Sequence, residues 1–318
     1  MSVIKLIRHQ AVKIYAYSGV WLTDRAEQQN LLALGFYRNT ITAQKKERVM
    51  QTETNNYKSL LVSVEQHVAT VTLDRPEIRN AFNDDMISEL TEVFTKLGAD
   101  DEVRVIVLAA AGKVFCAGAD LNWMRAMADY SHEENLADAD KLAQMLKTIY
   151  QCPKPTIAAI QGDVYAGGMG LVAVCDIAIA VKIANFCLSE VRLGLVPATI
   201  SPYVIRAMGA RAAQRYFLSA EVFDAKKARQ LGFIHERVSE EWLKEEVATL
   251  CAKMVKNSPD AVKTCKHLLH DIAGAPITDD LIADTVKGIA DIRASTQGKE
   301  GVQAFLQKRK PDWLIVPE

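Results

Sequence analysis

The segment 157–195 constrains the fold of this chain more than any other stretch. An apolar run predicts a buried strand at 156–160, and a turn of small residues follows at 166–168. Residues 171–175 then place apolar side chains at helical spacing, before a second apolar run at 177–181. A strand that passes through a glycine turn into a helix leaves backbone N–H groups free to face a negatively charged oxygen.

A lone acid, Glu190, closes this segment, with Leu188, Val191 and Leu193 around it. An acid in apolar surroundings is a candidate proton carrier. The bland interpretation is that the glycines only permit close packing of helix on strand, and that Glu190 lies on a solvated edge. From this stretch alone, both interpretations remain open.

A second loop of small residues, 115–120, also follows an apolar strand, predicted near 103–109. Small side chains let a ligand approach the backbone itself. If N–H groups from the two loops converge, they form an oxyanion hole that would stabilise a thioester enolate. The sequence does not show whether they converge. The chain has no GxGxxG dinucleotide fingerprint, no GxSxG elbow and no phosphate-binding P-loop.

The composition is that of an ordinary globular protein: 318 residues, 49% hydrophobic, with a net charge of −1. This charge implies no bulk attraction to nucleic acid or to an anionic membrane. No apolar run approaches the roughly 18 residues needed to span a bilayer. We therefore expect neither a nucleic-acid partner nor a membrane.

The cysteines point to a reducing compartment. None forms a CxxC pair, and no histidine lies at zinc-ligand spacing from them, so we expect no disulfide, no metal and a cytoplasmic location. The six are Cys116, Cys152, Cys175, Cys187, Cys251 and Cys265.

The chain divides into three parts by pattern. Residues 1–49 are rich in Arg and Lys and form a predicted extension, either an organelle transit peptide or a segment upstream of a natural start at Met50. Strands and helices alternate from residue 57, which predicts an α/β core over 50–250. We expect strands at 60–64 and 68–73 and a helix capped by Asn83.

After Pro202 the pattern is almost entirely helical, with one short strand near 234–238. Seven helices with one strand do not build another sheet layer. We therefore expect an appended helical portion after Pro202, and we assign 251–318 as a C-terminal helical region.

Several spaced motifs follow one another in this chain: RPEIRNAF at 75–82, FCAGADL at 115–121, IQGDVYAGGMG at 160–170, SEVRLGLVP at 189–197 and KEGVQAFLQKRKP at 299–311. In this order they resemble the enoyl-CoA hydratase/isomerase (crotonase) family. The resemblance runs from about Met50 to Trp313. It implies a crotonase-like ββα spiral core, a C-terminal helical trimerisation region, and homotrimers that pair into hexamers. The implied substrate is an acyl-CoA thioester, with no separate cofactor because CoA is part of the substrate.

The resemblance also implies roles for individual residues. The backbone N–H groups of Ala117 and Gly167 would form the oxyanion hole, and Glu190 would be the acid/base. The implied CoA-binding positions are Arg79, Ala81, Ala119, Asp120, Gly168, Phe305 and Lys308.

One position departs from the family pattern. The best-known hydratases of this family hold water with two glutamates; the second maps to Glu190, but the first maps to Gly170. A single glutamate is typical of the family's isomerases. Asp120, Asp129, Glu133 or Asp163 could supply the missing help, but the sequence does not place them.

The segments FCAGADLNWM and FCLSEVRLGLVPATISPYV are nevertheless similar to the bacterial methylglutaconyl-CoA hydratase branch of leucine breakdown. We therefore expect a hydratase acting on 3-methylglutaconyl-CoA or a related branched ester, with Arg192 or Arg125 as candidate partners of the acyl carboxylate. The alternatives are an enoyl-CoA isomerase, or a family member with impaired catalysis that binds CoA esters or RNA.

Overall fold

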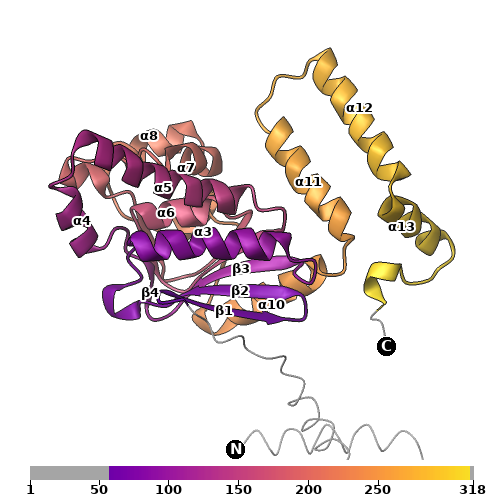
Figure 1. Ribbon diagram of the computed structural model, residues 1–318, viewed down its shortest axis with the longest axis horizontal. Coiled ribbons are helices and arrows are strands. Elements are labelled where there is room, and N and C mark those ends of the chain that lie inside the picture. The colour runs from indigo at the N-terminus through magenta and orange to yellow at the C-terminus, as the bar shows by residue number, and fades with distance from the viewer. Residues whose placement is uncertain (1–56, 316–318) are drawn as a thin grey trace, which may run out of the picture. The chain divides into compact units, whose positions relative to one another are not determined.

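The computed structural model describes residues 57–315 (Figure 1). Its strands form two sheets. The larger has the order β1-β2-β3-β5-β7-β10, with β1 antiparallel to β2 and all other pairs parallel. These strands are β1 (Leu60–Glu65), β2 (Val68–Leu73), β3 (Val105–Ala110), β5 (Thr156–Ile160), β7 (Ile177–Val181) and β10 (Glu236–Val238). The two strands predicted at the start of the core, 60–64 and 68–73, are thereby confirmed.

The smaller sheet has the order β4-β6-β8-β9. Here β4 (Val114–Cys116), β6 (Asp163–Tyr165) and β8 (Asn185–Cys187) are parallel, and β9 (Phe223–Asp224) is antiparallel to β8. None of these strands exceeds three residues, which is too short for a period-2 pattern to stand out in the sequence. None of the four is among the strands predicted from the sequence.

Three consecutive units share one connectivity: the first strand joins the large sheet and the second joins the small one. The pairs are β3 with β4, β5 with β6, and β7 with β8. Helical segments follow each pair: α4 (Leu121–Met127) and α5 (His132–Tyr150) after β4, α6 (Gly167–Ala173) after β6, and the 3-10 helix η2 (Glu190–Leu193) with α7 (Ser201–Met208) after β8. This repeat is the ββα arrangement expected of the core.

The helix α3 (Asp84–Ala99) shows why these residues form this element. The side chain of Asn83 accepts the N–H of Met86 at 3.1 Å and so caps the first turn, as predicted. The apolar face at helical spacing is buried: Met86, Ile87, Leu90, Val93, Phe94 and Leu97. In Figure 1, α3 runs beside α5, against which it packs.

The expectation of an appended helical portion directly after Pro202 is wrong. Strand β9 belongs to the small sheet and β10 to the large one. The helix α7 packs against α6, and α10 (Leu243–Met254) packs against β5 and β7. The helices α8 (Ala210–Ser219) and α9 (Ala225–Gln230) belong to the same part. Burial against the sheet, which a helical period does not reveal, made the difference.

The last helices extend beyond the sheets (Figure 1): α11 (Pro259–Ile272), α12 (Asp279–Ala294) and α13 (Thr296–Leu306). The predicted boundary between 250 and 251 falls within α10, and the predicted extension 1–49 lies outside the described residues. The three-part division therefore stays a prediction. No helix in 57–315 is long and apolar enough to cross a membrane. Within the same range all six cysteines are free thiols, and no cluster of residues could hold a metal ion.

A buried ion pair ties α11 to the sheet. The ammonium of Lys266 lies 2.7 Å from the Asp176 carboxylate, and it also donates to the Lys154 carbonyl at 3.1 Å. The same carboxylate oxygen accepts the backbone N–H of Thr156 at 2.7 Å. The Lys266 side chain is only 7% exposed, so its charge depends on these partners.

We expect Lys266→Met to lower the free energy of unfolding by about 1–3 kcal/mol, because Asp176, which is only 24% exposed, would keep its charge without its cation. Urea unfolding followed by circular dichroism measures this. Lys263→Met is the matched control, since Lys263 is exposed on the same helix. Equal stability of the two variants would contradict the role given to the pair.

Candidate active site

Three loops meet at one edge of the small sheet. The strands β4, β6 and β8 are adjacent and parallel, so their carboxyl ends lie at the same edge. The segment 117–120 follows β4, the turn 166–168 follows β6, and Glu190 comes shortly after β8. Crevices at the carboxyl ends of parallel strands are the usual place for ligands in α/β sheets. The structure thus brings both small-residue loops and the lone acid together.

The first two loops touch through their backbones. A Cβ placed on Gly118 would lie 2.9 Å from the Ala166 Cβ, and the Gly167 nitrogen is 3.7 Å from the same point. A Cβ on Gly168 would lie 2.9 Å from the Cys116 carbonyl oxygen. Distances below 3.0 Å leave no room for a side chain, so glycine at these positions permits the approach.

The N–H groups of the first loop have different partners. Ala117 donates to the Arg79 carbonyl at 3.0 Å, so its N–H is engaged within the protein. Phe82 pairs with both neighbours of Ala119: it donates to the Gly118 carbonyl and accepts from Asp120, each at 2.8 Å. The N–H of Ala119 finds no acceptor among the described residues.

The turn after β6 supplies two more free donors. Gly167 and Gly168 are the first residues of α6, and their N–H groups have no acceptor in the part of the chain that the structure describes. Ala166, just before them, has a φ of 48°, which is unusual for a residue with a Cβ. Strained backbone of this kind costs about 1–3 kcal/mol and is concentrated at functional sites.

Glu190 has the environment of a proton carrier. Its Oε2 atom is buried and has no hydrogen-bond partner among residues 57–315. Burial raises the pKa of this carboxyl above its ordinary value, because the charged form loses hydration. The solvated-edge interpretation therefore does not hold for Glu190.

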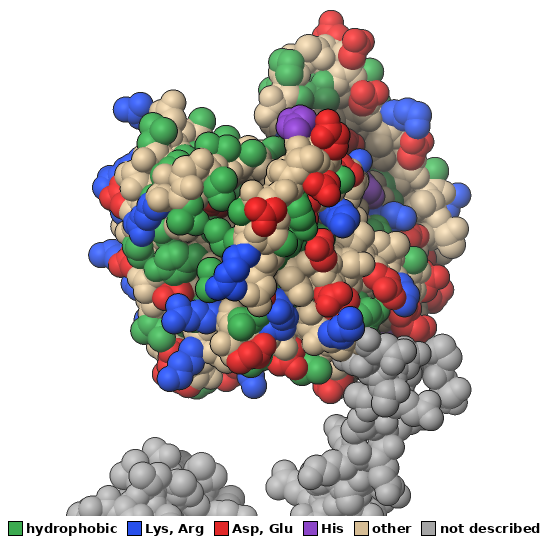
Figure 2. Space-filling view, turned by 60° about the vertical axis from the view of Figure 1, so that its left-hand side comes forward, with side chains coloured by type: hydrophobic (Ala, Val, Ile, Leu, Met, Phe, Trp, Pro, Cys, Tyr) green, Lys and Arg blue, Asp and Glu red, His purple; other side chains and the backbone are tan. Residues whose placement is uncertain are grey.

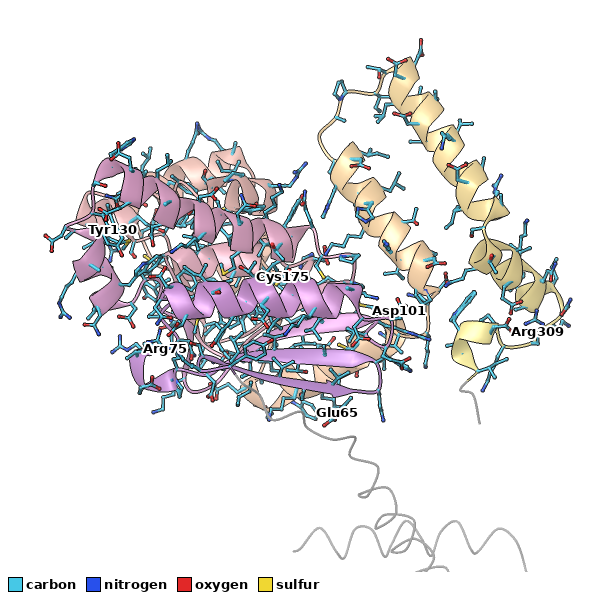
Figure 3. All side chains as sticks on the ribbon, in the orientation of Figure 1. Glu65, Arg75, Asp101, Tyr130, Cys175 and Arg309 are labelled. Carbon is cyan, nitrogen blue, oxygen red and sulfur yellow. The ribbon has the colours of Figure 1, made fainter. Side chains whose placement is uncertain are left out.

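Other predicted residues serve the fold. The Asp120 carboxylate pairs with the Arg75 guanidinium at 3.0 Å and caps α4 by accepting the N–H of Asn122 at 2.7 Å. Figure 3 labels Arg75, which lies on the loop that leads from β2 toward α3. The Ala81 carbonyl accepts a second hydrogen bond from Arg75, at 3.0 Å. These contacts hold the segment 75–82 against the first loop.

The predicted C-terminal CoA positions lie on another element. Phe305 is on α13 and 82% exposed, while Lys308 follows the helix with a φ of 55°. Lys308 makes no ion pair within the described residues. The structure connects neither residue to the two loops by a hydrogen bond.

Comparison with known proteins identifies the family. A sequence profile described as enoyl-CoA hydratase/isomerase matches residues 63–314. The chain belongs to this family. It is 32% identical over 258 residues to the 2,3-dehydroadipyl-CoA hydratase of Escherichia coli, covering 80% of this chain and 98% of that protein.

Solved structures agree with this family. An enoyl-CoA hydratase from Shewanella pealeana is 43% identical with a TM-score of 0.81, over 83% of this chain and all of that one. An enoyl-CoA hydratase from Mycobacterium smegmatis is 34% identical with a TM-score of 0.76, covering 81% and 99% of the two chains. The crotonase-like α/β fold class is confirmed.

Apolar side chains occupy the space beside Gly170, the position to which the resemblance maps the first glutamate. A Cβ at this position would overlap the Cγ2 atom of Ile200 and lie 3.4 Å from Leu146. Both side chains are buried, so apolar packing fills the space that a glutamate would need. Of the acids considered as substitutes, Asp163 accepts two hydrogen bonds from Asn185 and Asp120 is paired with Arg75.

Two features escaped the sequence analysis. Ile200 carried no signal, because a lone apolar residue does not reveal which glycine it packs on. The second is Asp138, a buried acid on α5 whose Oδ1 accepts the Trp123 indole N–H at 3.1 Å. Burial raises the pKa of Asp138. The contact favours a packing role for Trp123, one of the two roles the sequence left open.

We expect Gly170→Ala to lower the free energy of unfolding by about 1–3 kcal/mol, because the added methyl group would overlap Ile200. Adding Ile200→Ala should make the glycine substitution less costly, a coupling that a double-mutant cycle in urea measures.

The control is Gly288→Ala, since Gly288 lies on α12 with nothing within 4 Å of the added Cβ. This change should stabilise the helix by up to about 1 kcal/mol, as alanine does in open helix positions. Additive effects at 170 and 200 would refute the proposed contact.

Proposed function

We propose that this protein is an enoyl-CoA hydratase, which adds water across the double bond of a 2-enoyl-CoA thioester. One observation carries the proposal: free backbone donors from two loops share the carboxyl edge of β4, β6 and β8 with Glu190, whose Oε2 atom is buried without a partner. The names of the similar proteins support the same reaction. The proposed chemistry uses only the protein, the thioester and water.

In the proposed reaction, the thioester carbonyl oxygen accepts the N–H groups of Ala119 and Gly167. We assign this role to Ala119 in place of Ala117, whose N–H already donates to Arg79. Such donors stabilise the enolate because they are held in place before charge develops. Gly168 then lies at the same turn, where its small size lets the substrate approach.

Glu190 is proposed to carry the proton. Its carboxylate accepts a proton from water as the hydroxyl group bonds to C3, and the electron pair of the double bond moves to the thioester oxygen. The protonated Glu190 then delivers that proton to C2, which restores the thioester and the carboxylate. A raised pKa suits a group that must both accept and release a proton.

The proposed acyl group carries a carboxylate, as in 3-methylglutaconyl-CoA or a related branched ester. The Escherichia coli relative is named for a thioester of a dicarboxylic acid. Arg192, two residues after Glu190, donates to the Ala220 carbonyl and has no carboxylate partner within 57–315. It therefore offers a cation near the acid/base.

An isomerase is the second candidate, favoured by the packing of Ile200 on Gly170, which leaves Glu190 without a second glutamate. In that reaction Glu190 would move a proton between C2 and C4, with no water added.

Assembly into homotrimers or hexamers is also proposed. Figure 2 shows hydrophobic side chains gathered on one face of the molecule. Exposed apolar residues also follow Glu190 and line α12 and α13: Leu193, Leu195, Val196, Ile282, Val286, Ile289, Val302, Phe305 and Leu306. Covering this surface by another copy would place Phe305 and Lys308 beside a neighbouring CoA, together with the segment at Arg79 and Ala81.

We expect Glu190→Gln to lower kcat for hydration of 3-methylglutaconyl-CoA by about 10²–10⁴-fold, since the amide cannot carry the proton. Loss of the conjugated thioester absorbance measures the rate. The wild-type rate should fall as the pH drops through the raised pKa of Glu190, because the carboxylate must be ionised to accept a proton from water.

Glu236→Gln serves as the control, because Glu236 is an exposed acid outside the site. An unchanged rate in Glu190→Gln would refute the role of Glu190. Double-bond migration on a 3-enoyl-CoA without hydration of any 2-enoyl-CoA would replace the hydratase by the isomerase.

We expect Arg192→Gln to lower kcat/KM for the carboxylate-bearing ester by about 10-fold or more, through loss of a charge-assisted hydrogen bond. The rate with crotonyl-CoA, which has no second carboxylate, should be nearly unchanged. Arg125→Gln tests the other candidate cation. Equal losses on both substrates would show that Arg192 only supports the fold.

A further inference from the structure

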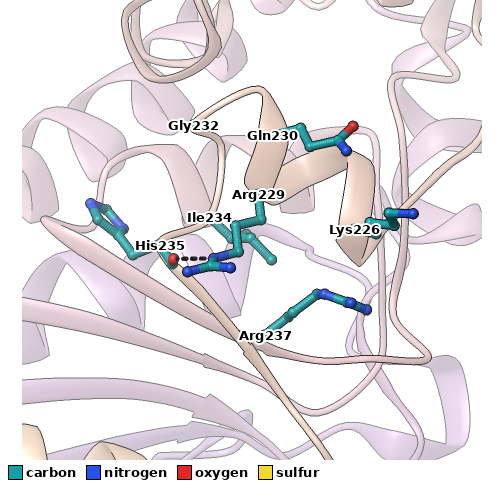
Figure 4. A pocket seen from close by; sticks show the side chains of 7 residues that line it. All are labelled: Lys226, Arg229, Gln230, Gly232, Ile234, His235 and Arg237. Carbon is teal, nitrogen blue, oxygen red and sulfur yellow. Dashed lines mark hydrogen bonds between the residues drawn. The ribbon is translucent and has the colours of Figure 1, made fainter.

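A second hollow, distinct in its residues from the candidate active site, lies between α9 and β10 (Figure 4). Its volume is about 720 Å³, within the range of small-molecule pockets. It is lined by Lys226, Arg229, Gln230, Gly232, Ile234, His235 and Arg237.

The lining is strongly basic. Lys226, Arg229 and Arg237 contribute three cations, and no aspartate or glutamate lines the hollow. The whole chain carries a net charge of only −1, so this is a local concentration of positive charge. A concave surface with one sign of charge attracts ions of the opposite sign.

Arg229 is held in place by the protein itself. Its Nε donates to the His235 carbonyl at 3.1 Å, as Figure 4 shows, and its Nη2 lies 3.1 Å from the Glu236 carboxylate. Glu236 therefore balances the charge of Arg229. The remaining positive charge of the hollow comes from Lys226 and Arg237.

Arg237 is the residue that most strongly indicates an anion in the hollow. It lies in the middle of β10, the edge strand of the large sheet, and it is half-buried. Among residues 57–315 its guanidinium has neither an ion pair nor a hydrogen bond, and the same is true of the Lys226 ammonium. A half-buried cation without a protein partner is open to pairing with an anion in the hollow.

His235 borders the hollow through its backbone carbonyl, which accepts the Nε–H of Arg229 (Figure 4). Its ring is fixed to β7, because Nδ1 accepts the backbone N–H of Ala178 at 3.1 Å. Figure 4 shows this ring on the far side of Arg229 from Arg237 and Lys226.

We propose that this hollow binds the diphosphate group of a small molecule. An arginine fork matches two phosphate oxygens at once, and a lysine adds a point charge that a neighbouring phosphate can share. The concave shape and size favour a small ligand over a protein surface. Inorganic pyrophosphate and a nucleoside diphosphate share this chemistry, and the proposal does not depend on the catalytic activity.

Isothermal titration calorimetry on the full chain at about 0.15 M salt tests the proposal, with pyrophosphate, ADP and AMP as probes. We expect saturable binding of one diphosphate per chain and weaker binding of AMP, which has a single phosphate. ADP binding more tightly than pyrophosphate would identify a nucleotide; the reverse would identify the free anion.

The variants Arg237→Gln and Lys226→Gln should each weaken diphosphate binding by about 10-fold, the effect of one charge-assisted contact. Lys253→Gln is the matched control, because Lys253 is exposed on α10 and lies outside the hollow. Lys308→Gln, a change at an implied CoA-binding position, should bind the diphosphates like wild type, which separates this hollow from the CoA site. Circular dichroism checks folding, and Lys226→Gln keeps the test open if Arg237→Gln unfolds.

Two results would overturn the proposal. One is the absence of saturable binding of either diphosphate at this salt concentration. The other is binding that Arg237→Gln and Lys226→Gln leave as strong as in the Lys253→Gln control.

Discussion

The close approach of two backbones, at Gly118 and at Gly168, is the constraint on which the site depends. No side chain fits at either position, and the contact sets how closely the loops after β4 and β6 approach each other. The parallel pairing of β4, β6 and β8 brings the loops to one edge. Glu190 reaches the same edge because β8 continues the sheet. A side chain at either glycine would push apart the two loops and the donors they carry.

Most backbone N–H groups around this contact are paired within the protein, and only a few are left for a ligand. Phe82 engages both neighbours of Ala119, and Arg79 engages Ala117, so one N–H of the loop remains for a ligand. Ala166, with its strained backbone, immediately precedes α6, and the N–H of Gly167 at the start of this helix is a second unpaired donor. With Gly168, the two loops leave three N–H groups unpaired within residues 57–315, and those of the half-buried Ala119 and Gly167 remain open to a ligand oxygen.

The acidic side chains also differ in whether the protein provides them with partners. Asp120, Asp163 and Asp176 each bind a cation or donors of the protein, and these contacts hold loops and helices in place. Glu190 alone among these four keeps a buried oxygen without a partner. At Gly170 the fold gives apolar packing to Ile200 in place of a further acid. Glu190 is therefore the one carboxyl group of these four with an oxygen left free for chemistry.

Local patterns in the sequence were sufficient for much of this protein. The period of α3, its Asn83 cap, the first two strands and the small-residue loops all depend on neighbours a few residues away. The spaced motifs were enough to indicate the family. Tertiary structure alone decided that Ala119 and not Ala117 has the free N–H, and that Ile200 fills the space at Gly170. It also decided that the helices directly after Pro202 pack against the core. Each depends on contacts between residues far apart in the chain, and a local pattern holds no information about which distant side chain or carbonyl will lie within reach.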